Sequence, residues 1–102
     1  MSFEFEWDPK KARANPKKHK GVTFEEGMTV FVDPLAKIFK DEEHSHDEER
    51  EIIIGHSTRQ RLILVSFTAA GTRIRIFSAR EATPTERKDY EENAESQRKH
   101  RG

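Results

Sequence analysis

The first residues of the chain alternate between aromatic and acidic side chains, with glutamates separating Phe3, Phe5 and Trp7. Successive side chains of a β-strand point to opposite faces, so this alternation predicts a half-buried strand over residues 2–7. From Asp8 onward the alternation stops, and patterns typical of helices follow.

A basic helix is predicted directly after this strand, over residues 9–20. Asp8-Pro9 suits its N-terminus, because the Asp side chain can accept hydrogen bonds from the first N–H groups and proline has no N–H to leave unpaired. Pro16 predicts a kink or a break within the helix, and Gly21 predicts its end.

A second helix is predicted from Thr23-Phe24-Glu25-Glu26, which has the T-x-x-E spacing of a capping box. Phe24, Met28 and Phe31 recur at helical spacing and give this helix one apolar face. Asp33-Pro34 is expected to end it, because the residue before a proline disfavours the helical conformation.

The second half of the chain carries most of the aliphatic residues and predicts short strands separated by polar segments. The strands are expected over residues 35–39, 52–54, 61–68 and 72–79, with a polar loop at 41–49, Gly55 ending the second strand and a turn at 69–71. Thr83-Pro84-Thr85-Glu86 is a further capping box and predicts a last, mostly polar helix. Elements in this order predict an α+β domain, with a mostly antiparallel sheet, two helices after the first strand and a C-terminal helix.

The composition is that of one highly charged domain, with 37% charged and 32% apolar residues among 102. We expect this domain to span residues 1–95, followed by a charged tail at 96–102. The chain has no cysteine, which excludes disulfides and thiolate zinc sites. It has no apolar run long enough to cross a bilayer and no signal-peptide pattern, so we expect a cytoplasmic protein that binds no membrane.

The charges cancel overall, with 19 basic and 19 acidic residues, but they are unevenly distributed. An acidic segment at 41–51 precedes a stretch, residues 52–80, that contains no Asp or Glu but has five arginines: Arg59, Arg61, Arg73, Arg75 and Arg80. Guanidinium groups can bind phosphates through two parallel hydrogen bonds and stay charged at any relevant pH. The arginine-bearing segment is therefore the candidate surface for a polyanion.

Strict alternation along the strand at 72–79 directs Arg73, Arg75 and Phe77 to one face of the sheet, and Ser78 with two isoleucines to the other. Arginine and aromatic planes stack on unpaired bases, which favours RNA as the polyanion. The alternative interpretation is a solvated face whose arginines pair with acidic residues of a neighbouring segment.

Other candidate groups lie elsewhere in the chain. Lys18-His19 offers an imidazole as a possible base, or else an exposed helix end, and Glu49-Arg50 offers a site pair or a surface ion pair. Tyr90 is either a core anchor or a site hydroxyl. His44-Ser45-His46-Asp47 contains metal-ligand types without a second cluster, so no metal is expected. No P-loop, dinucleotide-binding, hydrolase-elbow or zincin motif occurs.

These motifs together resemble the BrnT family of toxins from type II toxin–antitoxin systems. The resemblance covers roughly residues 3–91. It rests on F-E-W-D-P-K-K-A with Asn15, Lys18-His19, G-V-T-F-E-E, V-F-V-D-P, E-E-R-E-I-I-I-G-H-S, R-L-I-L-V-S-F-T and R-I-R-I-F-S-A-R-E-A-T-P-T-E-R-K-D-Y-E.

The resemblance implies a ribonuclease toxin with a RelE-like fold, RNA as its substrate and no cofactor. Its implied partner is a BrnA-like antitoxin with a ribbon–helix–helix domain, through which the complex would bind DNA. The chain departs from the family at three places. Lys20 looks inserted, and Pro16 falls in a helix that members usually keep continuous. Ala69-Ala70 stands in a turn where many members carry an arginine or another polar residue.

The expected reaction is metal-independent RNA cleavage by attack of a 2′-OH on the adjacent phosphate, which needs a base, cations and an acid. Arg61, Arg75 and Arg80 are expected to stabilise the phosphate. His19 or Glu49 is expected to act as the base, with Lys18 assisting. The expected catalytic residues are therefore Lys18, His19, Glu49, Arg61, Arg75 and Arg80. The residues expected to bind RNA are Arg50, Arg59, Arg73, Phe77 and Tyr90. The alternatives are a non-catalytic nucleic-acid-binding module and a partner-binding subunit that use the same arginine-rich face.

Overall fold

The order of elements matches the prediction in this computed structural model, which describes the backbone of residues 3–44 and 49–101. The strands of the described part are β1 (Glu4–Glu6), β2 (Lys37–Lys40), β3 (Glu51–His56), β4 (Leu62–Ala70) and β5 (Arg73–Glu81). Its helices are α1 (Pro9–Lys18), α2 (Phe24–Val30), α3 (Pro84–Arg101) and a short 3₁₀ turn (Glu42–His44). The residues predicted as a charged tail therefore continue α3 as far as Arg101.

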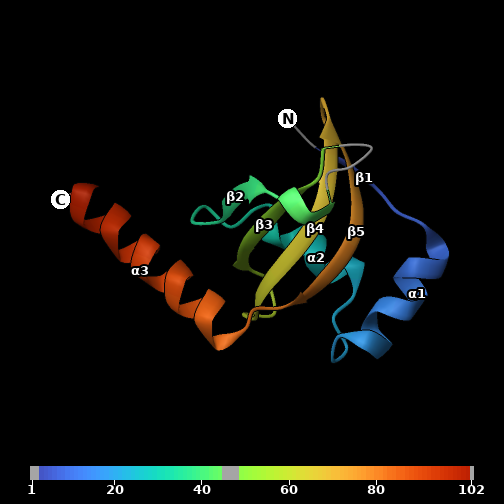
Figure 1. Ribbon diagram of the computed structural model, residues 1–102, viewed down its shortest axis with the longest axis horizontal. Helices are drawn as coiled ribbons and strands as arrows, with labels where there is room; N and C mark the ends of the chain where they lie inside the picture. The colour runs from blue at the N-terminus through green and yellow to red at the C-terminus, as the bar shows by residue number, and fades with distance from the viewer. Residues whose placement is uncertain (1–2, 45–48, 102) are drawn as a thin grey trace.

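The strands form one sheet in the order β1-β5-β4-β3-β2 (Figure 1). β1 runs parallel to β5, whereas every other neighbouring pair is antiparallel. The predicted α+β class with a mostly antiparallel sheet is therefore confirmed. The β4–β5 hairpin is longer than predicted, because β4 continues through Ala70 and β5 continues through Glu81.

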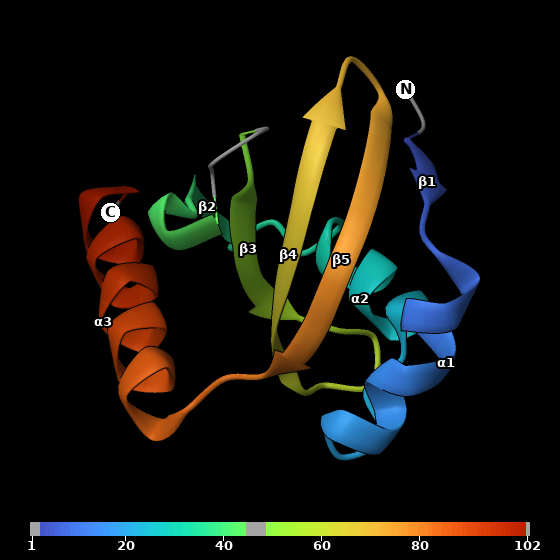
Figure 2. The same cartoon turned by 45° about the vertical axis from the view of Figure 1, so that its right-hand side comes forward.

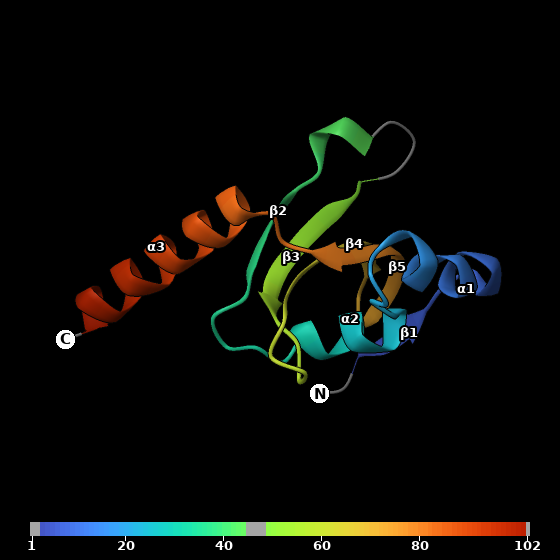
Figure 3. The same cartoon turned by 90° about the horizontal axis from the view of Figure 1, so that it is seen from below.

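The helices are divided between the two faces and one edge of the sheet (Figures 2 and 3). α2 covers what we call the inner face, where Phe24 packs with Ile63 and Ile76 in the larger core cluster. α3 touches the opposite, outer face through Tyr90, which packs in a smaller cluster with Leu64. α1 lies beside β5 (Figure 2). No helix in the described part is long and apolar enough to cross a membrane.

Pro16 does not break α1, which runs without interruption to Lys18. Proline cannot donate a backbone hydrogen bond, but this proline lies in the last turn, where few further bonds depend on it. The preceding residue, Asn15, is buried and hydrogen-bonded to β5, which holds the turn in place. Lys20 and Gly21 then adopt left-handed φ angles of 51° and 80°, so Lys20 belongs to the turn after the helix.

Gly55 lies inside β3 and does not end it, because the strand continues to His56. A Cβ atom at Gly55 would lie 2.9 Å from both Ala36 Cβ and Asp33 Oδ2. The glycine is needed because the segment between α2 and β2 approaches the strand closely. The sequence predicted that the strand ends here, because glycine is common in turns. That local preference carries no information about the tertiary contact with the segment between α2 and β2.

Gly55→Ala is expected to lower the free energy of unfolding by about 1–3 kcal/mol, because the added methyl group overfills this contact. Denaturant titration followed by circular dichroism measures the change. Gly71→Asn is the control, because Gly71 has a φ of 62° and open space around an added Cβ, and asparagine tolerates that conformation. A Gly55→Ala protein as stable as the wild type would contradict the packing argument.

Candidate active site

A β-bulge in β5 reorganises the outer face of the sheet. Ser66 pairs with Ser78, but the next residue of β4, Phe67, pairs with Ile76, so Phe77 is the extra residue. Ile76 lies in the inner core, whereas Phe77 and Ser78 both line a hollow on the outer face. The prediction that Ser78 shares a face with the isoleucines is therefore wrong, because strict alternation does not allow for a bulge.

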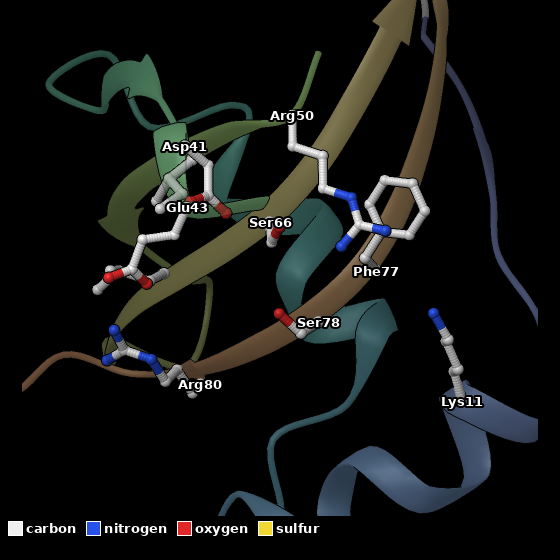
Figure 4. A pocket seen from close by; sticks show the side chains of 10 residues that line it. Lys11, Asp41, Glu43, Arg50, Ser66, Phe77, Ser78 and Arg80 are labelled. Atoms are coloured by element: carbon white, nitrogen blue, oxygen red, sulfur yellow. The ribbon is translucent and has the colours of Figure 1, made fainter. Parts of the chain in front are cut away.

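We call this depression the outer-face hollow (Figure 4). It is formed by α1, the segment after β2, the start of β3, the middle of β4 and the second half of β5. Its polar and aromatic lining consists of Lys11, Asp41, Glu43, Arg50, Ser66, Phe77, Ser78 and Arg80. Side chains from distant parts of the sequence are thus gathered around one concave surface.

Cations lie at several sides of the outer-face hollow. The Arg50 guanidinium stacks over the Phe77 ring, 3.9 Å from its centroid, and Lys11 Nζ lies 5.4 Å from the same centroid. Arg80 lines the hollow at the opposite end from Arg50 (Figure 4). Such an arrangement can bind an anion and an aromatic base side by side.

The end of α1 extends this cationic surface. Lys18 and His19 line an adjoining depression with Arg80 and a second one with Phe77 and Ser78. The structure therefore brings together three of the predicted catalytic residues, Lys18, His19 and Arg80, and places them next to the predicted base-stacking residue Phe77.

The buried side chain of Asn15 joins α1 to β5 at this site. Its amide donates hydrogen bonds to the carbonyl oxygens of Val22 (2.8 Å) and Ala79 (2.7 Å), and its Oδ1 accepts one from Ala79 N (3.3 Å). Because Ala79 lies between Ser78 and Arg80, these bonds fix α1 relative to the hollow. The sequence alone did not predict this role of Asn15. The available indication was an asparagine inside a predicted helix, because asparagine is a poor helix former.

Arg80 is held by a carboxylate from the first turn of α3. Its guanidinium donates two hydrogen bonds to Glu86, of 2.8 and 2.9 Å. Hydrogen bonding to Arg80 lowers the pKa of Glu86 to about 2, and burial opposes this shift. Glu86 also accepts a hydrogen bond from Thr83 N, which completes the predicted capping box.

The remaining predicted arginines are paired with carboxylates outside the hollow. Arg61 forms a two-point ion pair with the buried Glu26 of α2, and Arg59 lies 3.9 Å from the same carboxylate. Arg61 also lowers the pKa of Glu26 through this hydrogen bonding. The absence of acids from residues 52–80 therefore did not leave these arginines unpaired, because α2 supplies the carboxylate.

The arginines at the start of β5 are paired in the same way. Arg73 lies 3.6 Å from Glu4 and 3.4 Å from Glu6, and Arg75 donates a 3.0 Å hydrogen bond to Glu6. The acids come from β1, which pairs with β5 in parallel. Neither arginine lines the outer-face hollow, so the predicted convergence of all the arginines on one phosphate is not observed.

Two other predicted residues lie away from the hollow. Tyr90 is 4% exposed and its hydroxyl donates a 3.0 Å hydrogen bond to Asp33, which makes it a core anchor and leaves no ring face for a base. The Glu49 carbonyl accepts a hydrogen bond from Thr68, and Glu49 does not line the hollow, whereas Asp41 and Glu43 of the same acidic segment do. These two acids, Lys11 and the two serines were missed, because only the tertiary fold brings them together.

No metal site is found among the described residues, where no group of three or more histidine or acidic side chains could hold an ion. The His44-Ser45-His46-Asp47 pattern extends outside the described residues.

Comparison with known proteins identifies the class of this fold. Residues 7–86 match the family model described as "Ribonuclease toxin, BrnT, of type II toxin-antitoxin system". The structure is similar to the crystal structure of the Brucella abortus ribonuclease toxin BrnT, with a TM-score of 0.60 and 24% identity over 80% of this chain and 99% of that chain. Comparison with curated proteins finds no match.

The fold is therefore shared with a ribonuclease toxin. The family match covers most of the chain, and the protein belongs to the BrnT family of ribonuclease toxins of type II toxin–antitoxin systems. An RNA substrate and an antitoxin partner are implied by this membership.

Removal of the Asn15 side chain is expected to destabilise the protein. Asn15→Ala leaves buried backbone groups of Ala79 and Val22 without partners, so the free energy of unfolding should fall by about 2–4 kcal/mol. Lys17→Ala, an exposed change on the same helix, is the control and should alter stability by less than about 0.5 kcal/mol. Equal denaturation midpoints for the two variants would contradict the role assigned to Asn15.

The Arg80–Glu86 pair predicts a pH dependence of stability. The pKa of Glu86 is lowered to about 2 from 4.5, so its stabilisation is present above the unfolded-state value and is lost as the pH falls toward 2. With screening at this partly exposed pair, Glu86→Gln should cost about 1–2 kcal/mol at pH 7, and this cost should shrink below pH 4.5. Thermal unfolding of both proteins between pH 2 and 7 measures it; a difference that stays constant with pH would exclude the ion pair as its source.

Proposed function

We propose that this protein cleaves RNA at the outer-face hollow by a metal-independent reaction. The observation that carries the proposal is the convergence of Lys18, His19 and Arg80 beside the Arg50–Phe77 stack. Cations for a phosphate, an imidazole for proton transfer and a planar surface for a base are the groups that cleavage of single-stranded RNA needs.

In the proposed reaction the 2′-oxygen of a ribose attacks the adjacent phosphorus. A bond forms between the 2′-oxygen and phosphorus, and the bond from phosphorus to the 5′-oxygen of the next nucleotide breaks. The base takes the 2′-OH proton, and an acid supplies a proton to the leaving 5′-oxygen. The products are a 2′,3′-cyclic phosphate and a 5′-OH, so no water is consumed in this step.

The proposal assigns these tasks to residues that line the hollow and its extensions. Arg80 and Lys18 stabilise the charge that develops on the phosphate, and His19 is the base. Arg50 and Phe77 stack against a nucleobase. The predicted roles of Arg59, Arg61, Arg73, Arg75, Glu49 and Tyr90 are not carried into the proposal, because these side chains lie outside the hollow.

Arg80→Ala and His19→Gln are each expected to lower the cleavage rate of a single-stranded RNA by about 100-fold or more, because each removes a group that acts in the transition state. Arg73→Ala is the matched control, since Arg73 is paired to β1 outside the hollow, and it should change the rate less than about threefold.

The assay is repeated in EDTA, which should leave the wild-type rate unchanged. Loss of cleavage in EDTA would contradict the metal-independent reaction. Tight RNA binding without any cleavage would instead support the non-catalytic RNA-binding module.

We also propose a BrnA-like antitoxin as the neutralising partner, with a ribbon–helix–helix domain through which the complex binds DNA. The support is the family, whose members are toxins of type II toxin–antitoxin systems. Expression of the chain alone is expected to arrest growth, and co-expression with a BrnA-like protein is expected to restore it. Growth arrest that such a partner does not relieve would count against this assignment.

A further inference from the structure

Two serine hydroxyls lie on the floor of the outer-face hollow, where neither the sequence nor the family match assigns them a function. Ser66 of β4 and Ser78 of β5 are directly opposed in the strand register, immediately beside the bulge. Both are half-buried and both line the hollow between Arg50 and Arg80 (Figure 4). Within the described part of the chain, neither hydroxyl has a hydrogen-bond partner.

The bulge is the feature that presents this pair of hydroxyls. If Phe77 were paired regularly and did not bulge, strict alternation would direct Ser78 to the inner face, as it does Ile76. A bulge disrupts the ladder locally, and bulges often serve to re-aim a side chain near an active site. Here the strand gains two outward side chains in succession, an aromatic ring and a hydroxyl.

The spacing of the two hydroxyls suits one phosphate. Opposed residues of an antiparallel pair have Cβ atoms about 4.5–5.5 Å apart, so both hydroxyls can reach oxygens of a single group between them. The flanking charges favour an anion there, because Arg50 and Arg80 lie at the two ends and Lys11 at the side. Asp41 and Glu43 line the side of the hollow formed by the segment after β2 and would repel a phosphate toward β5.

We propose that Ser66 and Ser78 donate hydrogen bonds to the non-bridging oxygens of the phosphate that is cleaved. This inference rests on the proposed function and adds to it two catalytic residues that contact the reacting group. The hydroxyls stabilise the negative charge that builds on these oxygens during attack by the 2′-oxygen. Arg50 and Arg80 place guanidinium groups at the two ends of the hollow, and the serines supply neutral donors between them.

The test compares cleavage of one short single-stranded RNA by Ser66→Ala, Ser78→Ala and the double variant. Each single change should lower kcat about threefold to tenfold, the worth of one hydrogen bond, and the double change should lower it further. Binding of the matching DNA oligonucleotide, which lacks the attacking hydroxyl, should change less than kcat. Equal losses in binding and kcat would overturn an assignment to the cleaved phosphate.

A sulfur substitution tests the contact directly. Sulfur is a weaker hydrogen-bond acceptor than oxygen, so replacement of a non-bridging oxygen at the cleaved linkage should slow the wild-type protein. The double variant lacks the hydroxyls that would donate to this oxygen, so the sulfur substitution should slow it less than the wild type. An equal sulfur effect in both proteins would overturn the proposal, because a merely structural role of the serines predicts that result.

Two controls separate this proposal from general damage to the fold. Thr68→Val removes a hydroxyl from the same strand, one that already donates to the Glu49 carbonyl, and should leave kcat within about threefold of the wild type. Ser66→Thr keeps the hydroxyl and should retain most of the rate. If the wild type cleaves RNA and the double variant cleaves it at the same rate, the serine assignment alone is overturned. If the wild type cleaves no RNA, the serine assignment and the proposed function are both overturned.

Discussion

The hydrogen bonds between Asn15 and Ala79 connect the helix and the strand that carry the candidate site. β1 pairs with β5 only as far as Arg75, and the backbone groups beyond that point would otherwise be buried without partners. The Asn15 amide takes the place of a neighbouring strand at Ala79, and it does so from a helix. The bonds that complete the sheet edge therefore also set the position of His19 relative to Arg80.

Pairing of charges explains why most of the predicted arginines do not lie at the hollow. The carboxylates of Glu6 and Glu26 neutralise arginines at the β1 edge and beside α2, away from the hollow. Arg80 has its partner, Glu86, in the first turn of α3. A phosphate bound at Arg80 would compete with Glu86 for the guanidinium. Phosphate binding in the hollow would therefore weaken the contact that holds the start of α3 to β5.

The candidate site was only partly visible in the sequence. Lys18-His19 and Arg80 were predicted from their chemistry, and the fold places them together. The other predicted arginines illustrate the limit of such reasoning, because their ionic partners come from segments distant in the sequence. Ser78 was assigned to the wrong face, since one extra residue in a strand reverses the orientation of every side chain beyond it.

The sequence by itself determined the order of the elements and the α+β class. Helix starts such as Asp8-Pro9 and Thr23 are local signals, in which a side chain bonds the backbone within three residues. Only the tertiary structure decided that Gly55 continues a strand, that Asn15 substitutes for a strand partner and that Phe77 bulges. Each of these depends on a contact between residues far apart in the chain, and short-range patterns carry no information about which distant group will be there.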